Sequence, residues 1–149
     1  PAVLIWLSYR PPKGNEVATS TVSETSAETA PVPRSLQLAL AAARTAAEHQ
    51  GRQIQVLDLR EQTPLFDYFV IATGSSRRQM HAMSEEIDHK LEDDLHDRRM
   101  GIEGYQNSHW ILLDYGSVVV HLLDGEARAY YDLEGLWAEA PCVELPPAA

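Results

Sequence analysis

Hydrophobic side chains recur at steps of three and four residues in two stretches of the chain, which is the spacing of a helix with one buried face. The first helix is predicted to begin at Ser35, a residue that caps helices well, and to end at Gly51. The second is predicted to follow Ser76, which forms a capping-box pattern with Gln79, and to continue to Gly101. The buried positions are Leu36, Leu40, Ala43 and Ala47 in the first helix and Met80, Met83, Ile87, Leu91 and Leu95 in the second.

Short apolar runs between and after these helices predict strands. Residues 67–73 are apolar almost throughout, which is typical of a strand buried on both faces. Residues 114–117 predict a tight hairpin turn, because Asp, Gly and Ser favour such turns. The five predicted strands are residues 53–59, 67–73, 102–106, 110–113 and 118–123.

A third, shorter helix is predicted from the spacing of Tyr130, Leu133 and Trp137, and Pro141 would end it. The order helix, two strands, helix, three strands, helix is typical of a mixed sheet covered by helices. The fold class is therefore α/β in the broad sense (α+β), with a mixed sheet of about five strands in a single domain.

Residues 8–34 are rich in Pro, Ser, Thr and Glu and have no hydrophobic periodicity. Such a stretch buries too little apolar surface to offset its loss of conformational entropy on ordering. We therefore expect a disordered leader over residues 1–34, an ordered domain over residues 35–145, and a tail over residues 146–149.

The net charge of −10 is concentrated in the second half of the chain, where residues 101–149 hold Arg128 against eight carboxylates. An acidic surface repels the phosphates of nucleic acids and attracts basic proteins. Extensive direct binding to nucleic acid is therefore not expected. Charge alone leaves open whether the acidity attracts a partner or only keeps the protein soluble.

No apolar run approaches the roughly 18 residues of a membrane span, so we expect no membrane association and a cytoplasmic location. The single cysteine, Cys142, excludes an internal disulfide and cannot form a zinc site alone.

Two groups of residues have the composition of a metal-binding or catalytic site. Glu86 and Asp88 follow the turn at Gly74 at the spacing of a magnesium-binding nucleotidyltransferase, but residues two apart on a helix diverge by about 200°. His81 and His89 lie eight residues apart, about 12 Å along a helix, so they cannot bind one metal ion. A solvated helix face is the preferred interpretation of both groups. We expect no catalytic residue, metal ligand or cofactor.

Residues 74–76 turn the chain into the second helix beside Arg77 and Arg78, and an anion site could form there. The stretch lacks the longer glycine-rich loop of phosphate-binding motifs, so helix capping is the preferred explanation.

The acidic segment also carries an aromatic cluster, and aromatic anchors with an acidic rim are typical of a surface that binds a basic protein. We expect Trp137 to be core, Tyr115 to be exposed at the turn, and Trp110 to be either. The predicted partner-binding residues are Trp110, Asp114, Tyr115, Tyr130 and Tyr131.

Three stretches of the chain form a recognisable set in their order and spacing: residues 67–76 with Arg78 and Gln79, residues 110–116 with 118–121, and residues 130–134 with 136–137. Together they resemble the motifs of the Iojap family of ribosomal silencing factors. The resemblance implies a fold related to nucleotidyltransferases but without catalysis. It also implies a translational repressor that binds ribosomal protein fourteen of the large ribosomal subunit and blocks joining with the small subunit.

Two other functions stay open from the residues alone. One is a metal-dependent nucleotidyltransferase that uses Glu86 and Asp88, and the other is an acidic adaptor for a basic protein unrelated to ribosomes. The oligomeric state is also open, with a homodimer of the free protein as one alternative.

Overall fold

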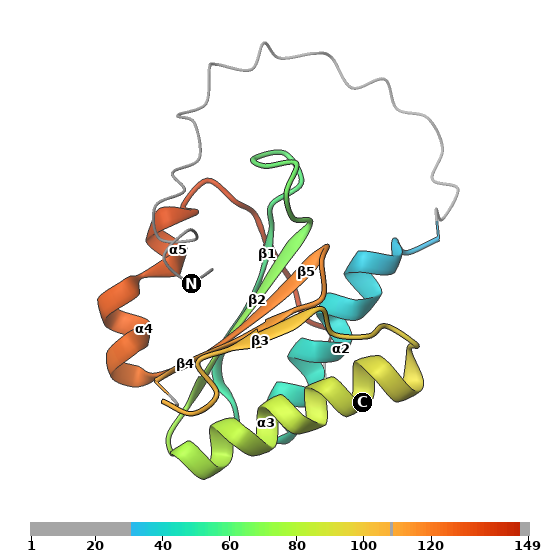
Figure 1. The fold of residues 1–149 in the computed structure, drawn as a ribbon. Helices are drawn as coiled ribbons and strands as arrows, with labels where there is room; N and C mark the ends of the chain where they lie inside the picture. Colours follow the sequence, from blue (N-terminus) through green and yellow to red (C-terminus); the bar gives the residue numbers. More distant parts are fainter. Residues whose placement is uncertain (1–30, 108, 147–149) are drawn as a thin grey trace.

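The computed structural model describes residues 31–107 and 109–146 (Figure 1). A sheet of six strands lies at its centre, in the order β3-β4-β5-β2-β1-β6. The strands are β1 (Arg52–Asp58), β2 (Tyr68–Gly74), β3 (Gly101–Glu103), β4 (Trp110–Asp114), β5 (Val118–Asp124) and β6 (Cys142–Val143). The central pair, β2 and β5, is parallel, and every other pair is antiparallel. The mixed sheet and the α+β class are confirmed, with one strand more than predicted.

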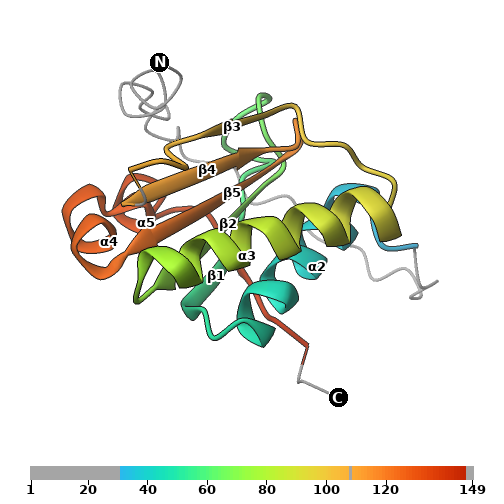
Figure 2. The same cartoon turned by 60° about the horizontal axis from the view of Figure 1, so that its bottom comes forward.

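Helices cover both faces of the sheet (Figures 1 and 2). The first face packs against α2 (Arg34–Glu48) and against α3 (Arg77–His89), which the π-helical turn η1 (Lys90–Asp94) extends. The opposite face packs against α4 (Gly125–Tyr131) and α5 (Leu133–Leu136). Strand β2 is buried at all seven positions, because successive side chains enter the two cores in turn.

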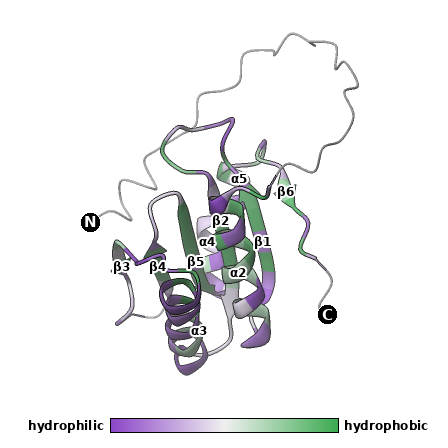
Figure 3. Cartoon of the chain, turned by 90° about the vertical axis from the view of Figure 1, so that its right-hand side faces the viewer, coloured by the Kyte–Doolittle hydropathy of each residue, from purple (hydrophilic) through white to green (hydrophobic). Residues whose placement is uncertain are grey.

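The hydrophobic stripe predicted for the long helix is confirmed, but the helical segment ends at Asp94, and Gly101 begins β3. Met80, Met83, Ile87 and Leu91 are buried in one cluster with α2 and the sheet, and Leu95 packs against its margin. Figure 3 shows the apolar colour gathered in the sheet and the polar colour on the outer side of α3. None of the helices formed by the described residues is long and apolar enough to cross a bilayer.

The buried face predicted for the first helix is wrong at three of its four positions, because Leu36 and Leu40 are half-buried and Ala47 is exposed. The buried residues of α2 include Leu38, Ala39, Ala42, Ala43 and Ala46.

The ends of α2 also differ from the prediction. The helix begins at Arg34 after Pro33, without a side-chain cap, and Ser35 is buried inside its first turn. At the other end Gln50, rather than Gly51, has the left-handed backbone, with φ of 66°. The glycine is still required, because a Cβ there would lie 2.7 Å from the carbonyl oxygen of Ala46.

The single helix predicted near residues 130–137 is wrong. Two short helices replace it, and they meet at Asp132, which has φ of 43°. The carboxylate of Asp132 accepts a hydrogen bond from the backbone N–H of Gly135 at 3.2 Å and so caps α5. Helix α4 begins earlier than predicted because Asp124 caps it, accepting from the N–H of Ala127 at 2.8 Å.

Strand β6 was not predicted, because a two-residue strand has no detectable periodicity. It pairs with β1 through Val143 and Cys142. The predicted leader lies outside the described residues from residue 1 to 30, and the predicted tail lies outside them from residue 147 to 149.

Candidate partner-binding site

Three aromatic rings form a series that runs from the core to the surface on the α4 side of the sheet; we call it the aromatic stack. Trp110, at the start of β4, is 7% exposed, and its ring centroid lies 4.6 Å from that of Tyr131. The ring of Tyr131 is in turn 5.0 Å from that of Tyr130, at an edge-to-face angle of 89°. Tyr130 is 81% exposed. The stack therefore presents one tyrosine to solvent on a rigid aromatic support.

Asp124 positions the helix that carries these tyrosines. One carboxylate oxygen caps α4, and the other lies 2.6 Å from Nδ1 of His109, the residue before Trp110. Burial alone would raise the pKa of Asp124, but the N–H of Ala127 and the nearby His109 hold that pKa below its ordinary value. The same carboxylate therefore ties the start of α4 to the start of β4 and fixes Tyr131 against Trp110.

The buried side chain of Arg128 connects α4 to the sheet. The side chain is 8% exposed and forms an ion pair with Glu134 of the α5 turn. It also donates hydrogen bonds to Thr73 Oγ1 at 3.0 Å and to the carbonyl of Gln53 at 2.7 Å. One guanidinium group thus joins β1, β2, α4 and α5. Periodicity gave no sign of this role, because a charged residue at such a position is ordinarily exposed.

Exposed charge in the segment that carries the aromatic stack is negative. Glu126, Asp132 and Glu139 are exposed, and Glu134 is half-buried. Within residues 109–146 the only Lys or Arg is Arg128, which is buried and paired. The segment that presents Tyr130 is therefore suited to a basic partner.

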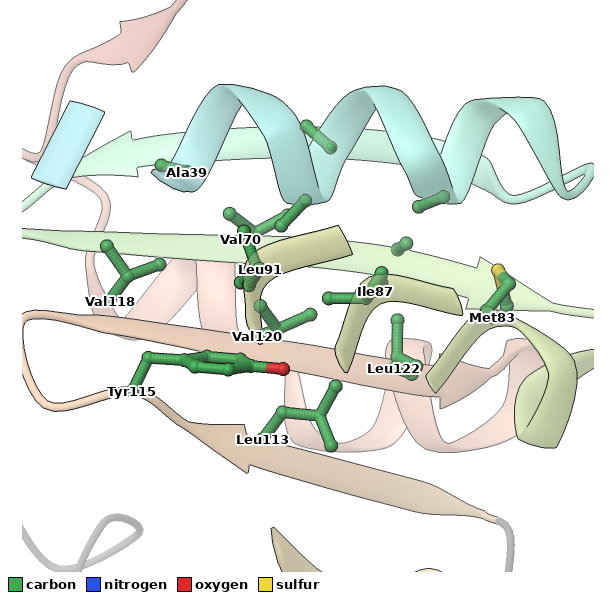
Figure 4. Packing of buried hydrophobic residues seen from close by; sticks show 14 of the residues in the cluster. Ala39, Val70, Met83, Ile87, Leu91, Leu113, Tyr115, Val118, Val120 and Leu122 are labelled. Carbon is green, nitrogen blue, oxygen red and sulfur yellow. The ribbon is translucent and has the colours of Figure 1, made fainter. Parts of the chain in front are cut away.

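The other two predicted partner-binding residues lie elsewhere. Asp114 and Tyr115 sit at the opposite end of β4 from Trp110, and the exposure predicted for Tyr115 is wrong. Its ring is 4% exposed and lies in the core on the α3 side, near Leu113 and Val120 (Figure 4). Asp114 is half-buried and accepts a hydrogen bond from the N–H of Gly116 at 2.8 Å.

Tyr115 is buried because a carboxylate on α3 receives its hydroxyl. The hydroxyl donates to Asp88 Oδ1 at 3.0 Å, and Arg99 donates to Asp88 Oδ2 at 2.9 Å. Burial, followed by the negative charge of Asp88, raises the pKa of Tyr115 well above its usual range. Asp88 is therefore half-buried and bonded at both oxygens, whereas Glu86 is exposed, so the solvated face predicted for this pair is wrong for Asp88.

The predicted histidine face is also partly covered. The ring of Tyr105 stacks on that of His81, with the ring centroids 4.0 Å apart. The hydroxyl of Tyr105 donates a hydrogen bond to Glu85 at 2.6 Å. The capping box at the start of α3 is confirmed, since Ser76 Oγ accepts from the N–H of Gln79 at 3.1 Å. Gln79 reaches back to the N–H of Ser75, one residue before the predicted position. No three side chains of His, Cys, Asp or Glu in the described part of the chain come together in a way that could hold a metal ion.

Comparison with known proteins relates the chain to one family of ribosomal factors. A family model described as "ribosomal silencing factor during starvation" matches residues 32–149. The ribosomal silencing factor of Bacillus subtilis is 36% identical over 105 residues, which are 70% of this chain and 87% of that protein.

Two further relatives extend the comparison. The mouse protein "mitochondrial assembly of ribosomal large subunit protein 1" is 37% identical over 93 residues, which are 60% of this chain and 40% of that protein. A crystal structure of a protein from Chromobacterium violaceum superimposes with a TM-score of 0.67 at 32% identity, covering 77% of this chain and 92% of that one. These matches show that the chain belongs to the ribosomal silencing factor family, whose Iojap motifs its sequence carries.

Proposed function

We propose that the protein represses translation by binding the large ribosomal subunit through ribosomal protein fourteen and blocking the joining of the small subunit. The action is one of occupancy rather than catalysis, and it takes place in the cytoplasm. We assign it to residues 35–145.

Family membership supports the ribosomal part of this proposal. The bacterial relatives are named ribosomal silencing factors, and the mouse relative is named for assembly of the ribosomal large subunit. A repressor that acts on one subunit needs only a specific docking face and enough bulk to obstruct the other subunit.

The aromatic stack is the observation that carries the proposed docking face. Tyr130 is 81% exposed, stands on Tyr131 and belongs to a segment whose exposed charged side chains are carboxylates. Ribosomal proteins are basic, so both the apolar anchor and the charge would be complementary to such a partner. We therefore centre the contact on Tyr130 and Tyr131, with Trp110 as their support. Asp114 and the buried Tyr115 lie away from this centre.

Co-sedimentation with purified large subunits tests the proposal. Replacement of a central interface aromatic costs about 2 kcal/mol or more, roughly 30-fold in affinity, so Tyr130→Ala should weaken binding by about that factor. Leu65→Ala is the matched control, because Leu65 is a large exposed side chain, 58% exposed, in the loop between β1 and β2. Both variants should melt like the parent, since neither residue is core.

A subunit-joining assay separates silencing from mere binding. The parent protein should lower the yield of joined ribosomes, and Tyr130→Ala should restore it. Binding of the parent to a basic protein but not to large subunits would instead indicate an adaptor unrelated to ribosomes. Loss of silencing in Glu86→Gln with Asp88→Asn, at a temperature where circular dichroism shows the variant folded, would indicate the nucleotidyltransferase alternative.

A further inference from the structure

Positive charge is unevenly distributed over this acidic protein. Of the Lys and Arg side chains in residues 31–107 and 109–146, five arginines have neither a carboxylate nor a carbonyl partner. They are Arg44, Arg52, Arg77, Arg78 and Arg98. Three of these five come from segments that the fold brings together at one end of the sheet.

Those three arginines, Arg52, Arg77 and Arg78, form what we call the basic corner. Arg52 begins β1 and pairs in register with Thr73 near the end of β2, and α3 begins with the other two. Gln79 ties the segments together, because its Nε2 donates to the carbonyl of Gln50 at 2.8 Å. All three arginines are exposed.

Few carboxylates offset the basic corner. In residues 48–53 and 73–79, which make up its backbone, Glu48 is the only acidic residue. Glu85, further along α3, accepts the hydroxyl of Tyr105 at 2.6 Å. A guanidinium without a carboxylate partner is free to bind a phosphate with two parallel hydrogen bonds. Asp124, which pairs with Gly74, is already bonded to His109 and to the N–H of Ala127. Within the two segments the charge is therefore opposite in sign to that of the protein as a whole.

The basic corner and the aromatic stack occupy the same end of the sheet. The last residues of β2 and β5 pair as Gly74 with Asp124, and α3 and α4 leave from there on opposite faces (Figures 1 and 2). Trp110 pairs with Leu123 at this same end. The backbones of Arg52 and Trp110 are separated by three strand spacings, β1 to β2 to β5 to β4, or about 14 Å. That separation fits within a single interface of ordinary size.

We propose that the basic corner binds the phosphate backbone of ribosomal RNA beside the docked basic protein. This inference rests on the proposed docking to the large subunit and adds a second contact to it. Binding of RNA by the whole surface is disfavoured by the net charge of −10, so only this corner would touch it. The contact would position the protein on phosphates and would carry no base sequence, because contacts to the phosphate backbone do not read bases.

Charge reversal tests the proposal. Arg77→Glu with Arg78→Glu should weaken binding to purified large subunits by about tenfold or more at moderate salt, and should reduce the slope of log affinity against log salt by about two. Arg98→Glu is the matched control, because Arg98 is an exposed, unpaired arginine beyond the far end of α3 and η1. Glutamates in the first turn of α3 favour its N-terminus, so the fold should persist. Arg52→Glu provides an independent variant on a strand.

Two further titrations separate this inference from the proposed function. Isolated ribosomal protein fourteen should bind the parent and the charge-reversed variant with equal affinity. If charge reversal instead weakens binding to the isolated protein as much as binding to large subunits, the inference is overturned. Protein-free RNA of the large subunit should bind the parent more tightly than the reversed variant, while Tyr130→Ala should behave like the parent. If the parent fails to bind large subunits, the proposed function is wrong. The titration with protein-free RNA then tests by itself whether the basic corner binds phosphates. An unchanged salt slope and RNA affinity in the reversed variant would overturn it.

Discussion

Trp110 donates a hydrogen bond from its indole Nε1 to Nδ1 of His121, 3.0 Å away in a fully buried setting. An indole nitrogen can only donate, so Nδ1 must be the unprotonated acceptor and the imidazole must be neutral. Burial, with a smaller contribution from the positive charge of Arg128, lowers the pKa of His121 to about 3. The support beneath the aromatic stack therefore depends on an uncharged histidine.

We predict that acid destabilises the protein through His121. The folded-state pKa of about 3 lies below the ordinary value of 6.5, so the unfolded state binds more protons between these two pH values. This contribution to the free energy of unfolding is fully present above pH 6.5. As the pH falls from 6.5 towards 3, the free energy of unfolding should decrease by up to about 1.4 kcal/mol for each pH unit.

Urea unfolding between pH 7.5 and 4.5 (about the range in which a free histidine titrates) measures this dependence. His121→Asn keeps an acceptor for Trp110 and removes the titrating group. The variant should be less stable than the parent at pH 7.5 but should show a flatter dependence on pH. Parallel curves for the two proteins would contradict the assignment.

A second prediction concerns the buried tyrosine of the hairpin. Tyr115→Phe removes the hydroxyl that donates to Asp88 and keeps the packing of the ring. A hydrogen bond to a charged group contributes about 1.5 to 3 kcal/mol, and the partial exposure of Asp88 places the loss at the lower end, about 1.5 kcal/mol. The melting temperature should fall by several degrees while binding to large subunits stays unchanged. If Tyr115→Phe weakened binding to large subunits without lowering the melting temperature, Tyr115 would belong to the docking face after all.

The Arg128 anchor gives a third prediction. Arg128→Met leaves Glu134 without its ion-pair partner and Thr73 without a hydrogen-bond donor, so the free energy of unfolding should fall by about 3 kcal/mol. Arg128→Lys should recover only part of this loss, because one ammonium cannot reproduce the guanidinium geometry. A double-mutant cycle with Glu134→Gln measures the coupling energy, and additive losses would show that the ion pair contributes little.

The fourth prediction compares alanine substitutions at two glycines, one crowded and one in open space. Gly104 has φ of 76°, and a Cβ there would lie 1.9 Å from the carbonyl oxygen of Trp110. Gly104→Ala should therefore destabilise the protein by about 2 kcal/mol or more and displace the start of β4. A Cβ at Gly101 would meet no atom within 4 Å, so Gly101→Ala should change stability by less than about 0.5 kcal/mol. Denaturant unfolding of both variants checks the contrast, and similar losses would refute it.

Much of the fold was predictable because its strands and long helix have strong hydrophobic periodicity. The stripe from Met80 to Leu91 has one buried face, and the run at residues 68–74 is buried throughout. The C-terminal helices were not predictable in this way. Tyr130 and Leu133 have helical spacing, but the left-handed residue Asp132 interrupts the helix between them. An aspartate that both breaks one helix and caps the next produces no change in hydrophobic pattern.

The candidate site was predictable in composition but not in arrangement. Trp110 and Tyr115 are close in the sequence, yet an odd separation along a strand places two side chains on opposite faces of the sheet. The ring of Tyr115 joins the α3 core because Asp88, 27 residues earlier, receives its hydroxyl. Such a long-range hydrogen bond leaves no local signal. The sequence placed Arg77 and Arg78 beside a possible anion site but gave no sign of Arg52, which comes to the same end of the sheet only through the pairing of β1 with β2.

The parallel pairing of β2 with β5 has a consequence for how the chain acquires its structure. Tyr68 pairs with Val118 and Gly74 with Asp124, so the two central strands are 50 residues apart in the sequence. Closure of so long a loop is slow compared with formation of the local β4–β5 hairpin. During synthesis the β1–β2 hairpin, once made, has no neighbour for the buried edge of β2 until residue 124 has left the ribosome. The centre of the sheet therefore forms only after β5 has been synthesised, and folding intermediates with an open β2 edge should be detectable in stalled chains that stop before residue 118.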